Sequence, residues 1–95
     1  MPPGRSLRQP HRDHYEIIKV ILQNVFSKIG GCKPYELAYR CQLNWPQFTY
    51  YRDILLSNKL LTSSNTEPNH HYEITPKGIR FLGIFAEIED DLRPT

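Results

Sequence analysis

The sequence predicts a mainly α-helical domain with one small β-hairpin, and three observations support this fold class. Four stretches of the chain repeat apolar residues every three or four positions, which is the spacing of amphipathic helices. Turn-forming residues at 65–71 separate two short runs that are typical of strands. No apolar run approaches the about 20 residues that cross a bilayer, so we expect no transmembrane segment.

The length and charge of the chain indicate one small, weakly basic domain. Its 95 residues carry a net charge of +2, and the pI is about 8.6. Residues 1–11 hold three prolines, a glycine and basic residues, which predicts a flexible basic arm. This arm either follows a phosphate backbone or merely solubilises the protein. The start lacks the apolar stretch of a secretory signal, so we expect a cytoplasmic protein.

The first helix is expected to begin at Asp13 or His14, where an acidic residue suits the positive end of the helix dipole. Its apolar face is predicted to comprise Tyr15, Ile18, Ile21, Leu22, Val25 and Ile29. Gly30 and Gly31 are expected to end the helix, since glycine adopts the left-handed cap conformation at little cost. We assign this helix to the scaffold.

A short second helix is predicted from Pro34 to Cys41, because proline suits the first helical position. Leu37, Ala38 and Cys41 share one face of this helix. We expect Cys41 to be a small residue packed where two helices cross. The spacing of Cys32 and Cys41 does not match the close cysteine pairs of zinc sites, so we expect neither a metal nor a cofactor.

The third helix has the strongest start signal in the chain. Asn44 is a favourable N-cap, and Gln47 three residues later completes a capping box. The buried face is predicted to comprise Phe48, Tyr51, Ile54 and Leu55. The outward face is predicted to comprise Gln47, Thr49, Tyr50 and Asp53. About three residues join this helix to the second, which is typical of a helix-turn-helix.

A hairpin and a last helix complete the predicted fold. Residues 60–64 and 72–75 are expected to be its strands, and helical spacing returns after Pro76. The order of elements is that of a winged helix-turn-helix, with a three-helix core, a wing hairpin and a C-terminal dimerisation helix. We expect residues 1–11 to be the arm, 12–75 the winged domain, and 76–95 the dimerisation helix and tail.

The chain resembles the small archaeal winged-helix proteins that are predicted to be DNA-binding transcriptional regulators. The similarity runs from about Tyr15 to Ile88. It is carried by Tyr15-Glu16-Ile17-Ile18, Tyr39, Leu43-Asn44-Trp45-Pro46-Gln47-Phe48, Lys59-Leu60-Leu61 and Tyr72-Glu73-Ile74-Thr75-Pro76-Lys77-Gly78-Ile79-Arg80-Phe81-Leu82. The last stretch is the most specific, because it resembles the family's aromatic-x-hydrophobic-Thr-x-Lys-Gly-x-x-Phe-Leu signature.

The resemblance implies a homodimer that presents its third helices to successive major grooves. It also implies DNA contacts from the residues that match the exposed recognition-helix positions, here Pro46, Gln47, Thr49 and Tyr50. The sequence departs from the family, which often has lysines where Thr49 and Tyr50 stand and a glycine where Lys59 stands. The recognition helix is therefore poor in positive charge on its outer face.

Side-chain chemistry indicates further contacts with DNA. Gln47 can bond an adenine edge bidentately or merely complete the capping box, and Asn44 can reach a phosphate if its cap role leaves it free. Candidate phosphate contacts are Arg40, Arg52, Lys59 and Lys33. Trp45 is expected to pack on the second helix near Tyr39 rather than to read bases.

The wing tip offers a weaker candidate, His70. The segment Asn69-His70-His71 holds no arginine or lysine, so its insertion into a minor groove has little support at neutral pH. Adjacent histidines can become charged at mildly acidic pH or bind a metal, although a solvated turn is the simpler interpretation.

The C-terminal helix is predicted to pair with a second copy. Basic residues lie at its positive end and acidic residues at its negative end, an order that an antiparallel partner would compensate. Its apolar residues are also too many for one face. The residues expected at the dimer interface are Phe81, Ile84, Phe85, Ile88 and Leu92.

Two functions compete on these observations. The first is a dimeric protein that binds double-stranded DNA, as a transcriptional regulator or an architectural protein. The second is a winged-helix module that docks on protein through its aromatic, weakly charged third helix. An enzyme is the weakest alternative, because no nucleophile-base spacing, phosphate-binding loop or metal-ligand cluster stands out. We also expect no membrane and no small-molecule substrate as partner.

Overall fold

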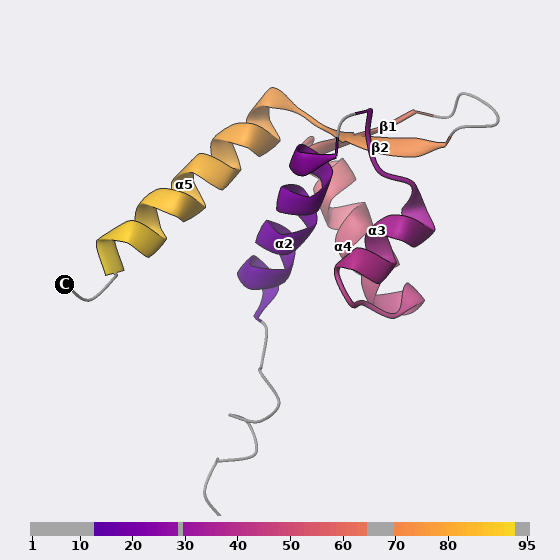
Figure 1. The fold of residues 1–95 in the computed structure, drawn as a ribbon, viewed down its shortest axis with the longest axis horizontal. Coiled ribbons are helices and arrows are strands. Elements are labelled where there is room, and N and C mark those ends of the chain that lie inside the picture. The colour runs from indigo at the N-terminus through magenta and orange to yellow at the C-terminus, as the bar shows by residue number, and fades with distance from the viewer. Residues whose placement is uncertain (1–12, 29, 65–69, 93–95) are drawn as a thin grey trace, which may run out of the picture.

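The computed structural model describes residues 13–28, 30–64 and 70–92, and it confirms a mainly helical chain with one hairpin. The elements in chain order are α2 (His14–Ser27), α3 (Pro34–Arg40), α4 (Trp45–Ser57), β1 (Leu61–Ser64), β2 (His71–Ile74) and α5 (Pro76–Leu92). In Figure 1, α2, α3 and α4 gather on one side of the hairpin, while α5 extends away from α3 and α4. The predicted arm at residues 1–11 and the turn at 65–69 lie outside the described residues.

Helix α2 begins at His14, one of the two predicted starts, with Asp13 as its N-cap, but it differs from the prediction in two details. The Asp13 side chain accepts a hydrogen bond from the Glu16 backbone nitrogen at 2.8 Å. Tyr15, predicted for the apolar face, is 66% exposed, because it lies in the first turn at the edge of the domain. The helix ends at Ser27 rather than at the glycines, because Lys28 is already extended. Ile29, also predicted for the apolar face, lies outside the described residues.

The core lies between the three bundled helices and the hairpin. The buried side chains of α2 are Ile17, Ile18, Ile21, Leu22 and Val25. From α3, α4 and the turn that joins them come Leu37, Ala38, Cys41, Leu43, Phe48, Tyr51 and Leu55, with Ile54 partly buried. Burial of one such large apolar side chain contributes about 1.5–3 kcal/mol, so these residues supply the main stabilising term. The buried faces that were predicted for α3 and α4 are therefore confirmed.

Both helices of the helix-turn-helix end in the same way. The backbone nitrogens of Gln42 and Leu43 donate to the carbonyls of Tyr39 and Ala38, each at 3.0 Å, which is the pattern of a Schellman motif. At the end of α4, Lys59 donates to the Leu56 carbonyl at 3.1 Å and Leu60 to the Leu55 carbonyl at 2.9 Å. The residue that turns the chain has a positive φ in each case, 58° at Gln42 and 63° at Lys59. Neither position carries the glycine that this conformation favours.

The hairpin pairs β1 with β2 in antiparallel register, with Leu61 opposite Ile74 and Ser64 opposite His71. β1 begins one residue later than predicted, and β2 takes in His71 but not Thr75. Outside the hairpin, the backbone nitrogen of Cys32 donates to the Tyr72 carbonyl at 3.0 Å, and the Cys32 carbonyl accepts from the Tyr72 nitrogen at 2.8 Å. The segment before α3 thereby adds a single residue pair to the far edge of β2.

The close approach behind this bridge depends on Gly31. Its φ is +92°, and a Cβ atom there would lie 2.8 Å from the Tyr72 carbonyl oxygen and 2.4 Å from the His71 ring. Any side chain would force the two segments apart, because these distances are shorter than ordinary contacts.

Helix α5 is attached to the hairpin at its first turn. Thr75 Oγ1 donates to the Lys59 carbonyl at 2.7 Å and accepts from the Gly78 nitrogen at 3.0 Å. Gly78 is the only buried residue of α5, and a Cβ there would lie 2.4 Å from the Leu60 carbonyl oxygen. Farther along, Phe81, Leu82 and Phe85 are partly buried against the core. No helix in the described ranges is long and apolar enough to cross a membrane.

Candidate nucleic-acid interface

The predicted capping box fixes the start of α4. Asn44 Oδ1 accepts from the Gln47 nitrogen at 2.9 Å, and Gln47 Oε1 accepts from the Asn44 nitrogen at 3.1 Å. Thr49 Oγ1 donates to the Pro46 carbonyl at 3.0 Å. The side-chain oxygens of all three residues are thus engaged with their own backbone. A bidentate adenine contact by Gln47 would compete with the helix cap.

The outward face of α4 presents the residues that the sequence placed there. Gln47 and Pro46 are exposed, Tyr50 is 56% exposed, and Thr49 is partly buried. The Tyr50 ring lies edge-on to Tyr51, with centroids 5.0 Å apart and planes at 87°. Because Tyr51 is held in the core, this contact positions the Tyr50 ring at the surface.

Trp45 packs on α3 as predicted, but its partner is not Tyr39. The indole stacks on Tyr35, with ring centroids 4.6 Å apart and planes at 20°, and it also contacts Phe48. Tyr39 is 84% exposed. The difference follows from helix geometry, because Tyr35 lies one turn before Tyr39 and its side chain meets the start of α4. Trp45 itself keeps 39% of its surface exposed, so it lies beside the candidate interface.

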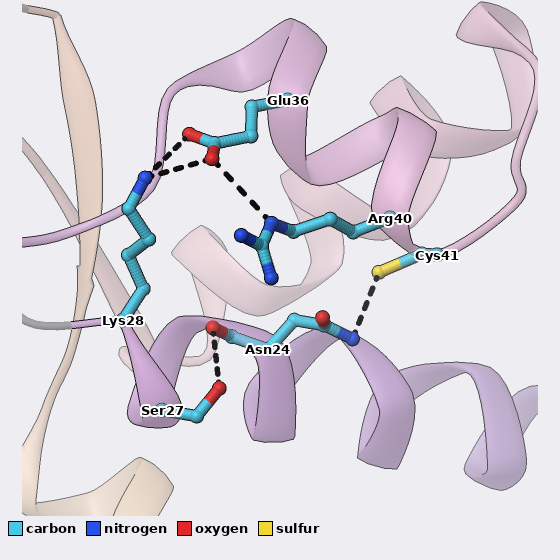
Figure 2. Close-up of polar contacts among 6 residues, drawn as sticks. All are labelled: Asn24, Ser27, Lys28, Glu36, Arg40 and Cys41. Carbon is cyan, nitrogen blue, oxygen red and sulfur yellow. Dashed lines mark hydrogen bonds and ion pairs between the residues drawn. The ribbon is translucent and has the colours of Figure 1, made fainter.

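A group of three charged residues joins α2 to α3 and includes the candidate Arg40 (Figure 2). The Glu36 carboxylate accepts from Lys28 Nζ at 2.9 and 2.7 Å and lies 3.4 Å from Arg40 Nε. Hydrogen bonding to Lys28 holds the pKa of Glu36 below its ordinary value. Two cations share one carboxylate, so this group keeps a net positive charge, to which exposed Lys33 adds.

The other candidate phosphate contacts differ in how far they are engaged. Arg52 is partly buried and bonds Asp53 Oδ1 through Nε at 3.0 Å. Its positive charge is therefore offset on α4 itself. Lys59 is exposed just beyond the end of α4, at the left-handed position of the second Schellman motif. Of these two, Lys59 is the better placed to meet a phosphate.

His70 lies at the base of the wing turn and has partners within the hairpin. Its Nε2 is 3.0 Å from Ser63 Oγ, and its ring lies 5.4 Å from that of Tyr72. The neighbouring His71 faces Glu73, with Nε2 and Oε2 3.0 Å apart. These contacts hold His70 against the hairpin, while Asn69, the first residue of the predicted wing tip, lies outside the described residues.

Sequence reasoning missed three residues near this surface, namely Lys28, Tyr35 and His14. The nitrogen Nδ1 of His14 lies 2.6 Å from the Tyr51 hydroxyl and so ties the start of α2 to the middle of α4. The two residues are 37 positions apart, and no local pattern signals such a pair. Lys28 could have been found only as a basic residue near Glu36 in sequence.

The cysteines match the structural role that was predicted for Cys41. Cys41 is buried, and Asn24 Nδ2 of α2 lies 3.7 Å from its Sγ, as Figure 2 shows. Cys32 is also buried, and burial raises the pKa of its thiol, which disfavours the reactive thiolate. Within the described ranges, no group of His, Cys, Asp and Glu side chains could hold a metal ion.

Helix α5 leaves an apolar surface uncovered. Ile84 is 53% exposed, Ile88 48% and Leu92 77%. Tyr15, Phe81, Ile84, Phe85 and Ile88 line an apolar groove of about 150 Å³ where α5 passes the start of α2. Close to the end of α5, Glu89 forms an ion pair with Lys19 of the same chain. The residues predicted for a dimer interface thus divide into two partly buried phenylalanines and three exposed aliphatic residues.

The order of helices, the capped second helix of the turn and the hairpin agree with a comparison to protein families. Residues 11–92 match the model of the winged helix-turn-helix family. The chain belongs to this family. A comparison with curated proteins finds no match.

Solved structures share this winged helix-turn-helix fold. A crystal structure of Sso10a-2, a DNA-binding protein from Sulfolobus solfataricus, has a TM-score of 0.68 at 26% identity over 85% of each chain. A mutant of MepR from Staphylococcus aureus has a TM-score of 0.73 at 16% identity, covering 94% of this chain and 66% of that one. A MepR–DNA complex has a TM-score of 0.70 at 17% identity, covering 94% and 73%. The chain thus spans just under two thirds of the MepR mutant.

Proposed function

We propose that this winged helix-turn-helix protein binds double-stranded DNA as a homodimer, with α4 in the major groove, and acts as a transcriptional regulator. The observation that carries the proposal is the capped, outward start of α4, together with the net positive charge of the Lys28–Glu36–Arg40 group and of exposed Lys33. The solved Sso10a-2 and MepR structures support it, since the first is described as a DNA-binding protein and the second is also seen with DNA. No enzymatic activity is part of the proposal. An archaeal origin and a cytoplasmic location stay predictions.

The residues proposed to meet DNA fall into two groups. Pro46, Gln47, Thr49 and Tyr50 are proposed to face the groove, as α4 presents them outward. Those proposed to face phosphates are Arg40, Lys59 and Asn44, with Arg52 and His70 nearer the edge of the interface.

A binding assay at several salt concentrations tests this function. We expect the affinity for a labelled 30-base-pair duplex to fall steeply between 50 and 200 mM salt, because phosphate contacts release counterions. The double variant Lys33→Gln/Arg40→Gln removes two phosphate contacts from each subunit, so it should make the slope of log affinity against log salt shallower by about four for the dimer. The control variant Arg80→Gln, which removes one positive charge from α5, should leave the slope unchanged.

The absence of duplex binding at 50 mM salt would contradict the proposal. It would favour the second candidate, a protein-docking module, which the exposed rings of Tyr35, Tyr39 and Tyr50 support.

The proposed dimer rests on the uncovered surface of α5. Ile84, Ile88 and Leu92 are exposed along one helix, and burial of such side chains against a second copy would stabilise a two-fold pair. The partly buried Phe81 and Phe85 would form the floor of this interface. Because Glu89 pairs with Lys19 within one chain, we propose that apolar contact rather than exchange of charged ends dominates.

Sedimentation measures the oligomeric state directly. We expect a dimer at tens of micromolar and a folded monomer for Ile84→Asp, because a buried carboxylate in the interface is costly. The matched change Phe26→Asp, at an exposed residue of α2, should leave the dimer intact. A monomeric wild-type protein at this concentration would refute the dimer.

A further inference from the structure

The first two turns of α4 have an unusual surface for a helix that is proposed to enter a DNA groove. The side-chain oxygens that could accept hydrogen bonds from bases, those of Asn44 and Gln47, already accept from the helix backbone. The Thr49 hydroxyl donates to the Pro46 carbonyl. The first two turns of α4 therefore offer fewer free side-chain groups for hydrogen bonds to bases than a recognition helix usually does.

The surface that remains is largely carbon. We define the apolar head as Trp45, Pro46, Thr49 and Tyr50. Three of these residues are exposed, and the two rings are held by neighbours, Trp45 by its stack on Tyr35 and Tyr50 by its edge contact with Tyr51. Rings fixed in this way lose little conformational freedom when they meet a ligand. In the first two turns of α4, no charged side chain interrupts this surface.

The chemistry of the major groove offers one apolar group that matches such a surface. Each thymine presents its C5-methyl group there, whereas the other base edges present hydrogen-bond donors and acceptors. The amide N–H groups of Asn44 and Gln47 can donate, but thymine and guanine both offer acceptors, so donors alone discriminate poorly. The rings of Trp45 and Tyr50 can instead distinguish a base that carries a C5-methyl group from one that does not.

We propose that the apolar head reads thymine methyl groups in the major groove and gives the protein a preference for A·T base pairs. The inference rests on the proposed DNA binding and adds the chemical group that is recognised. It replaces the bidentate adenine contact of Gln47 as the source of base preference. Burial of each methyl group by the head is expected to strengthen binding about fourfold.

A substitution in the DNA tests this inference without changing the protein. Alternating d(A-T) and d(A-U) duplexes of 30 base pairs differ by the thymine methyl alone, and both keep the same hydrogen-bonding edges. At one salt concentration, we expect the wild-type protein to bind the thymine duplex at least about fourfold more tightly. A second pair, alternating d(G-C) with cytosine or with 5-methylcytosine, places a methyl group at the same groove position. We expect the protein to bind the 5-methylcytosine duplex more tightly than the cytosine duplex.

Protein variants assign the effect to the head. Trp45→Ala and Tyr50→Ala should each lower the thymine-to-uracil affinity ratio, and the double variant should bring it close to one. The matched control Phe26→Ala removes an exposed ring of α2 and should leave the ratio unchanged. Thermal unfolding of each variant verifies that α4 is still folded, and Tyr50→Ala is the safer probe because this ring is more exposed than that of Trp45.

The outcomes separate this inference from the function on which it rests. Binding to both duplexes with an equal affinity would overturn methyl reading and keep DNA binding. A ratio that persists in the double variant would also overturn it, since another surface would then read the methyl groups. Failure to bind any duplex at 50 mM salt would overturn the proposed function itself.

Discussion

Helices α4 and α5 both expose apolar side chains, but they are held in the domain in opposite ways. α4 has a capping box at its start, a Schellman motif at its end and three fully or nearly buried side chains between them, Phe48, Tyr51 and Leu55. α5 is attached at its first turn, has Gly78 as its only buried residue, and carries exposed isoleucines along its length. The contrast indicates that α4 is complete within one chain, whereas α5 presents a surface that a partner would cover.

Truncation of one apolar side chain in each helix should show the largest difference. We expect Phe48→Ala to lower the free energy of unfolding by about 3–5 kcal/mol, because it leaves a cavity in the centre of the core. Ile84→Ala should change the stability of the monomer by less than about 0.5 kcal/mol, since Ile84 is half exposed. Urea unfolding at low protein concentration measures both values. Equal effects would contradict the view that only α4 is fixed within one chain.

The attachment of α5 can be tested at its two glycines. Gly78→Ala should destabilise the protein by about 1–3 kcal/mol, because the new Cβ would press on the Leu60 carbonyl and the Ile74 side chain. Gly83→Ala is the matched control in the same helix, where nothing lies within 4 Å of the new Cβ. It should stabilise the protein by about 0.5–1 kcal/mol through helix propensity. Destabilisation by both changes would mean that the first turn is not the point of attachment.

A smaller effect than those of Phe48→Ala and Gly78→Ala is expected at the end of α4. Lys59→Gly should stabilise the protein by about 0.5–1 kcal/mol, because the left-handed conformation at φ 63° is costly for any residue with a Cβ. Lys59→Ala removes the same charge but keeps the Cβ, so it should give no such gain. Thermal denaturation of the three proteins separates the two causes. An equal gain from alanine would point to charge instead of backbone strain.

The sequence predicted the features that depend on neighbouring residues. The start of α2 at Asp13 or His14, the cap of Asn44 and the short connection between α3 and α4 follow from contacts within a few positions, and the structure confirms them. The backbone conformation at Lys59 also explains why related proteins often have a glycine at this position. A glycine is common there because the position needs a positive φ.

Features that depend on the packing of distant elements were not predictable in the same way. Tyr15 fits the periodic apolar face of α2, yet the periodicity does not reveal that the core ends before the first turn. The stack of Trp45 on Tyr35 depends on how α3 and α4 cross. The contact of His14 with Tyr51 joins residues that no spacing rule relates. The contacts of the proposed interface stay predictions, because a sequence places a side chain on a face but does not name its ligand.

The bridge between Cys32 and Tyr72 has a consequence for mutational tolerance. Two backbone hydrogen bonds set the spacing between the hairpin and the start of α3, so no side chain is required to maintain it. Side chains on the exposed faces of both segments are therefore free to vary without altering the distance between the wing and the helix-turn-helix. The one strict requirement is the absence of a side chain at Gly31. A library of substitutions should accordingly find position 31 intolerant while its exposed neighbours accept many residues.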